Sequence, residues 1–196
     1  MALNITGDAP ADALLTDDPF ALLVGMLLDQ QVPMETAFAG PAKIRDRMGG
    51  FDPETVAAAD PEAFAAVFKE SPAVHRFPGS MAGRVQALAA EVRDEWGGHA
   101  EAIWTRPGID GLAPDGAEIL RRLQELPGFG EQKAKIFLAL LGKQCGLEAE
   151  GWREAAGDYG AQGSYRSVAD IVDADSLAKV REAKKAAKAK SKAAKG

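Results

Sequence analysis

Apolar residues recur along much of the chain at intervals of three and four, the spacing that places side chains on one face of an α-helix. One such face is formed by Met81, Val85, Leu88 and Val92. Asp60–Pro61 is typical of a helix start, with aspartate as N-cap and proline in the first turn. Gly97–Gly98 is typical of a helix end. Stretches with a period of two are scarce, so the pattern predicts an all-α protein, a compact bundle of about ten short helices in two lobes.

Two of the predicted helices are apolar on most of their faces. Residues 20–31 read FALLVGMLLDQQ, and residues 131–143 read EQKAKIFLALLGK. Helices of this kind are usually buried, so we expect both in the core. The first run is short enough that a buried strand is the alternative.

The segment Leu126–Gly130, LPGFG, interrupts the helical pattern in front of the second apolar run. Pro127 ends one helix, and the two glycines permit positive φ and a close approach of a ligand to the backbone. The next helix then presents its free N–H groups beside this hairpin, which is a suitable site for an anion. Lys133 and Lys135 add positive charge there. The alternative is an ordinary turn between two helices.

The full string Leu-Pro-Gly-Phe-Gly-x-x-Lys-Ala, followed by an apolar helix, resembles the helix-hairpin-helix motif of the HhH-GPD superfamily of base-excision DNA glycosylases. We place the motif at residues 117–143. Residues 22–37, LLVGMLLDQQVPMETA, are similar to a helix at the DNA cleft of alkyladenine-type members. In that helix a side chain near a glutamine pair helps to fill the duplex when a base is flipped out. The resemblance implies a DNA-glycosylase-like fold, double-stranded DNA as partner, and DNA contacts by Gln30, Gln31, Gly128, Phe129, Gly130, Gln132 and Lys133.

The hairpin also bears on the type of glycosylase. Bifunctional members of the family carry a lysine two residues after the second hairpin glycine, and its amine attacks the sugar. This sequence has Gln132 there, and its lysine follows at position 133. One residue along a helix rotates a side chain by about 100°, so Lys133 does not simply replace the nucleophile. The resemblance therefore implies a monofunctional enzyme, with Lys133 as a phosphate contact or a solvated helix lysine.

The family's catalytic aspartate is expected about one helix length after the hairpin, near residues 148–152, where this sequence has no aspartate. The candidates, in order of preference, are Glu150, Glu148 and Asp158. Each of them is otherwise an ordinary solvated acid. Trp152 beside them is a candidate for stacking on a flipped base, with core packing as the alternative. Further aromatic candidates are Trp104, Tyr159 and Tyr165.

Composition excludes several kinds of site. The 196 residues fit one domain or two closely joined lobes. The single cysteine, Cys145, excludes a disulfide framework and any thiolate cluster of zinc or iron–sulfur type, and the two histidines lie far apart. We expect no metal and no cofactor, which separates the chain from the iron–sulfur branches of the family. The sequence shows neither a signal peptide nor a long apolar run, so we expect the protein in the cytoplasm, associated with the nucleoid and not with a membrane. We also expect a monomer.

Charge divides the chain in two. The net charge is −6, but residues 179–196 carry eight cations and one anion, hence +7, which leaves −13 on residues 1–178. We therefore predict a helical domain over residues 1–178 and a lysine-rich basic tail over residues 179–196. The tail is either a solvated, frayed helix or a tether for polyanions.

Three functions are compatible with these observations. The favoured one is a DNA glycosylase that hydrolyses the N-glycosidic bond of a damaged base. A non-catalytic DNA-binding protein that keeps the fold but lacks the acid is the first alternative. A helical interaction domain that does not bind DNA is the second, because the body is acidic. The sequence does not identify the damaged base, because the choice of base depends on the shape of the pocket.

Overall fold

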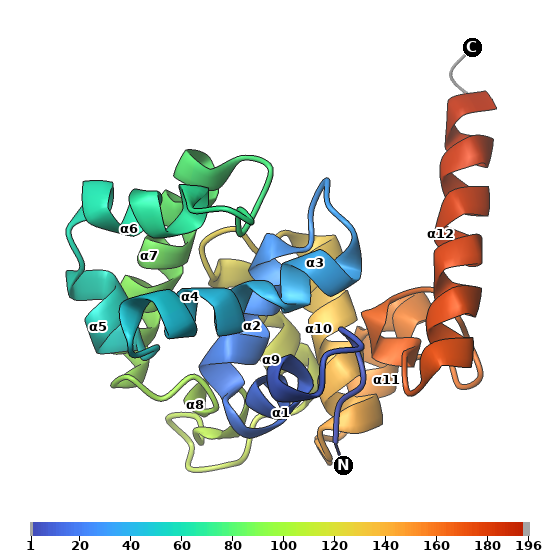
Figure 1. Cartoon of the computed structure of the whole chain (residues 1–196). Coiled ribbons are helices and arrows are strands. Elements are labelled where there is room, and N and C mark those ends of the chain that lie inside the picture. Colours follow the sequence, from blue (N-terminus) through green and yellow to red (C-terminus); the bar gives the residue numbers. More distant parts are fainter. Residues whose placement is uncertain (1, 194–196) are drawn as a thin grey trace.

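The computed structural model describes residues 2–193, and within this range the chain forms helices and no strand (Figure 1). The helices are α1 (Ala9–Asp17), α2 (Pro19–Leu28), α3 (Met34–Phe38), α4 (Gly40–Met48), α5 (Pro53–Ala58), α6 (Pro61–Lys69), α7 (Pro78–Trp96), α8 (Ala102–Thr105), α9 (Gly116–Glu125), α10 (Glu131–Gln144), α11 (Trp152–Ala155) and α12 (Ala174–Ala193). Two 3-10 turns, η1 (Gly157–Gly160) and η2 (Val168–Asp170), precede α12. The predicted all-α class is confirmed.

Helix α2 is the centre of the molecule. Every residue from Phe20 to Leu28 is buried, and α2 packs against α1, α3, α4, α7 and α10 (Figure 1). Gly25 permits the close contact with α3, because a Cβ atom there would lie 2.6 Å from the ring of Phe38. The predicted buried helix is confirmed, and the alternative of a strand is wrong.

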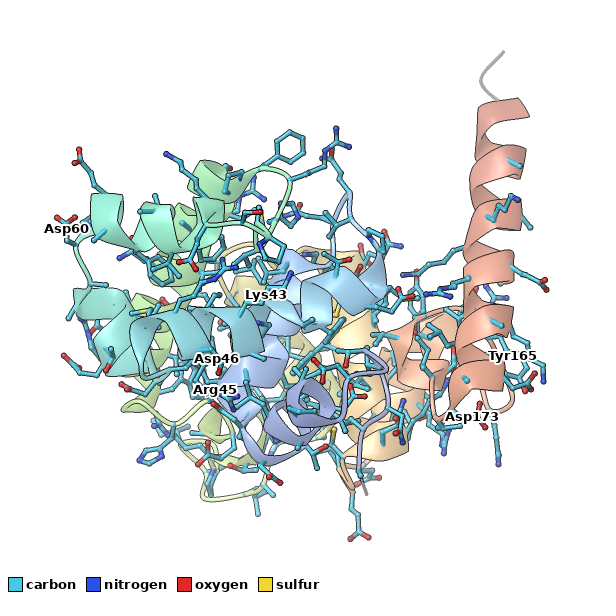
Figure 2. All side chains as sticks on the ribbon, viewed as in Figure 1. Lys43, Arg45, Asp46, Asp60, Tyr165 and Asp173 are labelled. Carbon is cyan, nitrogen blue, oxygen red and sulfur yellow. The ribbon has the colours of Figure 1, made fainter. Side chains whose placement is uncertain are left out.

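The predicted helix ends are formed by local interactions. The side chain of Asp60, at the start of α6, accepts hydrogen bonds from the backbone N–H groups of Glu62 and Ala63 (Figure 2). These bonds satisfy donors that have no partner inside the helix. Gly97 ends α7 with φ of 66°, in the left-handed region that glycine adopts without strain.

The remaining helices pack on two sides of α2. On one side α5 and α6 pack against α7, and on the other α9, α10 and α11 pack together (Figure 1). Trp152 of α11 holds the second group together. A Cβ atom on Gly142 of α10 would lie 2.4 Å from the indole, and one on Gly116 of α9 would lie 2.4 Å from the Trp152 Cα. Both glycines are therefore required by the close approach of the tryptophan.

Helix α12 begins inside the predicted domain and continues into the predicted tail. Val180 is fully buried against the core, and the far end of α12 extends beyond the other helices (Figure 1). The boundary at residues 178 and 179 therefore lies inside a continuous helix. The last three residues, among them Lys195, lie outside the described range. A separate function for residues 179–196 stays a prediction.

Substitution of Gly142 tests the packing of Trp152. The Gly142→Ala variant should lose about 1–3 kcal/mol of unfolding free energy, because the new methyl group displaces the indole. Gly83→Ala is the matched control. Gly83 also lies inside a helix, but its Cβ would meet nothing within 4 Å, so this variant should gain up to about 1 kcal/mol. Denaturant unfolding measures both, and equal effects would contradict the assigned packing.

Candidate functional site

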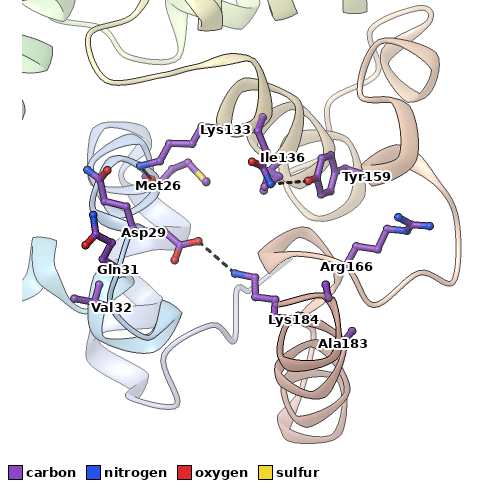
Figure 3. A pocket seen from close by; sticks show the side chains of 13 residues that line it. Met26, Asp29, Gln31, Val32, Lys133, Ile136, Tyr159, Arg166, Ala183 and Lys184 are labelled. Atoms are coloured by element: carbon purple, nitrogen blue, oxygen red, sulfur yellow. Dashed lines mark hydrogen bonds and ion pairs between the residues drawn. The ribbon is translucent and has the colours of Figure 1, made fainter. Parts of the chain in front are cut away.

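A cleft with a volume of about 820 Å³ lies between the end of α2, the start of α10 and the inner face of α12 (Figure 3). One wall is formed by Asp29, Gln30 and Gln31, which follow α2 directly. The opposite wall includes Gln132 of α10 and Tyr159 of η1. The cleft thus brings together two segments that lie far apart in the sequence and that the resemblance assigns to DNA contact, the glutamine pair and the start of the second hairpin helix.

The loop after α2 has an unusual backbone. Gln31 has φ of 58°, the one positive φ of a non-glycine residue among residues 2–193. Such a conformation is costly for a side chain with a Cβ atom and is often found at functional sites. Gln31 is exposed at the rim of the cleft, and it also borders a smaller groove formed with His75, Phe77 and Arg84. Gln31 therefore lies between the cleft and this smaller groove.

His75 holds this loop in place. Its Nε2 lies 2.9 Å from the carbonyl oxygen of Gln30, and its Nδ1 accepts a hydrogen bond from the Phe77 N–H at 3.1 Å. Because a carbonyl oxygen only accepts, both contacts are satisfied by the neutral ring with its proton on Nε2. The ring is 2% exposed, so His75 is a packed, positioning residue. The guanidinium of Arg84 meets the Gln30 side-chain oxygen at 3.5 Å.

The hairpin before α10 presents its backbone but not its aromatic side chain. Gly128 has φ of 81°, and a Cβ atom there would lie 2.3 Å from Leu27, so the hairpin packs directly on the end of α2. Phe129 is buried and meets Phe137 edge to face at 5.9 Å. Gly130 begins α10 without a side-chain cap. The first N–H groups of α10 therefore stay available to an anion, while Phe129 contacts the core.

Lys133 is not the solvated helix lysine that was one of the two expectations, and its contact with phosphate stays a prediction. Its ammonium group donates hydrogen bonds to the carbonyl oxygens of Met26, at 3.0 Å, and Leu27. These carbonyls belong to the last turn of α2, where the Met26 carbonyl oxygen also accepts a longer hydrogen bond, of 3.3 Å, from the Asp29 N–H. Burial of the side chain lowers the pKa of Lys133 to about 8. Lys133 therefore caps the central helix, and a phosphate contact would have to displace these bonds.

Gln132, the residue at the position of the family's nucleophilic lysine, lines the cleft. Its side-chain amide donates a hydrogen bond to the Tyr159 hydroxyl at 2.9 Å (Figure 3). Of the aromatic candidates, Tyr159 is the one that borders this cleft. Trp104 packs against Phe137 in the core, and Tyr165 lies beside the start of α12 under the ammonium of Lys179 (Figure 2).

The acids that the sequence analysis preferred lie away from the cleft. Glu148 and Glu150 are exposed beyond the C-terminal end of α10. The 14 residues of α10 span about 21 Å, and the cleft borders the opposite end of the helix. Asp158 is closer: its side chain is 79% exposed and pairs at 3.2 Å with Arg166, which lines the cleft. Trp152 is a core residue, and its indole is covered by Gly142 and the guanidinium of Arg153.

The acid that does line the cleft is Asp29. Its side chain is 11% exposed and points across the cleft to Lys184 of α12, with 3.6 Å between Oδ2 and Nζ (Figure 3). A second ion pair joins Glu35 of α3 to Arg181 of α12. Asp29 was not among the acids expected at the site, although it is the one charged residue in its apolar segment. Lys184 and Arg166 were not expected there either, because no local signal indicates that α12 lies across the cleft.

Among residues 2–193 no helix is both long enough and apolar enough to cross a membrane. The same residues contain no group of three or more His, Cys, Asp or Glu side chains arranged to hold a metal ion.

One comparison with known proteins gives a match. The model of a family described as HhH-GPD superfamily base excision DNA repair protein matches residues 24–195. The match covers most of the chain and includes the loop after α2, the hairpin and α12. No curated protein matches the chain.

The lowered pKa of Lys133 predicts a pH-dependent contribution to stability. Between about pH 8 and the ordinary lysine value of 10.5, the unfolded chain binds this proton more strongly than the folded chain. Stability contributed by Lys133 should therefore rise with pH across this window. Denaturant unfolding of the wild type and of Lys133→Met at pH 7 and pH 9.5 measures the effect. The free energy of unfolding of the wild type, minus that of the variant, should be larger at pH 9.5 than at pH 7. A smaller value at pH 9.5 would contradict the burial of Lys133.

The positive φ of Gln31 predicts a second effect on stability. Gln31→Gly should raise the free energy of unfolding by about 1 kcal/mol, because glycine adopts this conformation without strain. Gln30→Gly is the control, since Gln30 has no positive φ and loses its contacts with Met81 and Arg84. It should unfold more readily than the wild type. If both variants are destabilised equally, the backbone at Gln31 is not strained.

Proposed function

The chain belongs to the HhH-GPD superfamily of base excision DNA repair proteins, and from this membership we propose that it is a monofunctional DNA glycosylase. It hydrolyses the N-glycosidic bond of a damaged base in duplex DNA. The observation that carries the proposal is the cleft, where the strained Gln31 loop faces the start of the second hairpin helix.

The arrangement suits the extrusion of a nucleotide. A volume of about 820 Å³ lies within the usual range for small-molecule sites. The backbone of Gly128 and Gly130, together with the free N–H groups of α10, binds the phosphates of one strand. Gln31 takes the space that the flipped base leaves in the stack. Tyr159 offers an aromatic surface to the base inside the cleft.

The absence of a nucleophilic amine at position 132 supports a monofunctional reaction. The amide of Gln132 does not form a Schiff base, and the neighbouring ammonium of Lys133 is bound to carbonyl oxygens of α2. Water is therefore the nucleophile, and the products are a free base and an abasic site. Strand cleavage by the protein itself does not belong to this reaction.

A non-catalytic DNA-binding protein is the second candidate function. It is favoured by the positions of Glu148, Glu150 and Asp158, since none of these acids lines the cleft. A catalytic role for any of them stays a prediction. Among the three, Asp158 is best placed, through its ion pair with Arg166 at the edge of the cleft.

Charge on α12 supports binding to a polyanion. Lys184 and Arg181 lie beside the cleft, on the helix that contains most of the basic segment. Phosphate binding by such residues releases counterions, so affinity for duplex DNA should fall steeply with salt. The acidic body repels a duplex elsewhere and so favours this face.

An excision panel tests the proposal. Duplexes with alkylated, oxidised, deaminated or mismatched bases are incubated with the protein, and alkali then cleaves at abasic sites. At least one lesion should give a product after alkali but none before it. Treatment with borohydride should trap no covalent complex, because no amine joins the sugar. A trapped complex would overturn the monofunctional reaction, and tight, salt-sensitive binding without any product would favour the non-catalytic alternative.

A further inference from the structure

Asp29 is placed unlike the other buried or half-buried aspartates of the chain. Asp12, Asp18 and Asp170 each accept hydrogen bonds from backbone N–H groups and thereby fix a loop or a helix end. Within the described chain, the Asp29 carboxylate accepts no such bond; its one ion-pair contact is the 3.6 Å contact with Lys184. The carboxylate therefore does no capping.

The position of Asp29 is also unfavourable for a structural acid. It is the C-cap of α2, where the helix dipole is negative and a carboxylate is repelled. Only 11% of its side chain is exposed, so much of its hydration is lost as well. Two nearby cations offset part of this cost, Lys184 and the half-buried Lys133, whose pKa is raised by Asp29 against the larger effect of burial. An acid kept at such a site is a candidate for function.

The chemistry of the proposed function requires a carboxylate in the cleft. When an N-glycosidic bond breaks, the electron pair leaves with the base, and the sugar becomes a cation at C1′. A fixed negative charge in a water-poor site stabilises that cation strongly. Asp29 is the one acid among residues 2–193 that lines the cleft, and it points into it (Figure 3).

We infer that Asp29 is the catalytic carboxylate of this protein, in place of the missing aspartate after the hairpin, and that Lys184 is its positioning residue. The inference rests on the proposed function. After the bond breaks, water adds to C1′ and its proton passes to Asp29 and on to solvent. The base takes a proton from solvent, so the net reaction consumes one water and yields the free base and an abasic site.

Removal of the charge at Asp29 is the first test. Asp29→Asn keeps the shape of the side chain and removes an unfavourable charge from the end of α2. It should therefore unfold at the same temperature as the wild type or higher, while single-turnover excision falls by about 100-fold or more. Asp46→Asn, at an exposed carboxylate of α4 away from the cleft, is the matched control and should keep its rate within about threefold of the wild type. Glu150→Gln and Asp158→Asn test the rival acids. An unchanged rate in Asp29→Asn would overturn the inference.

Lys184→Met separates catalysis from attachment of α12. This variant breaks the same ion pair but leaves the carboxylate in the cleft. If Asp29 served only to hold α12, Lys184→Met and Asp29→Asn would lose activity equally. We expect Lys184→Met to lose about tenfold or less, because Lys184 acts through the carboxylate. Equal losses would overturn the catalytic role.

The second test needs no knowledge of the lesion. Duplexes carry either a cationic pyrrolidine or a neutral tetrahydrofuran in place of one nucleotide, and the pyrrolidine mimics the charged sugar of the transition state. The wild type should bind the cationic duplex about tenfold more tightly or better. Asp29→Asn should lose this preference and keep its affinity for the neutral duplex, and Lys184→Met should retain it.

The outcomes separate the role of Asp29 from the proposed function. A preference that is absent from the wild type, or that survives in Asp29→Asn, overturns the role of Asp29 and leaves the glycosylase proposal standing if excision occurs. Loss of the preference in Asp158→Asn in its place would move the role to that residue. Failure of the wild type to bind either duplex and to excise any lesion would overturn the proposed function, and the inference with it.

Discussion

The hydrogen bonds from the Lys133 ammonium to the last carbonyls of α2 join the two walls of the cleft. Helix α2 is buried from Phe20 to Leu28 and ends beside the hairpin, so carbonyl groups of its last turn face the start of α10. Without the Lys133 ammonium, the carbonyl oxygens of Met26 and Leu27 each lose a donor, and the helix end opens more easily to water. The cap therefore fixes the position of Asp29, Gln30 and Gln31 relative to Gln132.

Close packing reinforces this junction from a second direction. Gly128 of the hairpin approaches Leu27 so closely that any Cβ atom would collide with it. The hairpin glycine thus serves the protein core as well as the backbone contacts expected with DNA. The same holds for Phe129, which the resemblance assigns to the DNA-binding motif and the structure places in the core. In this hairpin, residues that the resemblance assigns to DNA binding also determine how α2 and α10 pack against each other.

The fold could be predicted from the sequence to the extent that its signals are local. Asp60–Pro61, the Gly97 helix end and the apolar run of α2 each act on their own neighbours. Proximity between distant elements could not be predicted in this way. Whether Trp152 stacks on a ligand or on the protein depends on Gly116 and Gly142, which lie on two other helices.

The same distinction between local signals and contacts of distant elements applies to the candidate site. The pairing of the Gln31 loop with the hairpin could be predicted, because both segments resemble one family. The acid that lines the cleft could not, since the acids at the expected position after the hairpin are exposed glutamates. Asp29 becomes a candidate only when α12 is seen to place Lys184 opposite it. A one-residue shift of the hairpin lysine, from 132 to 133, likewise changes its partner to the end of α2, which helical rotation alone does not reveal.

Two ion pairs tie α12 to the wall of the cleft, Asp29 with Lys184 and Glu35 with Arg181. Dissolved salt weakens these pairs in the free protein just as it weakens contacts with phosphates. Part of the cationic charge of α12 is thus already neutralised before any DNA binds. A plot of log affinity against log salt concentration will therefore have a shallower slope than the number of phosphates contacted in the complex would give. A number of phosphate contacts calculated from such a slope is therefore smaller than the number of phosphates that the protein contacts in the complex.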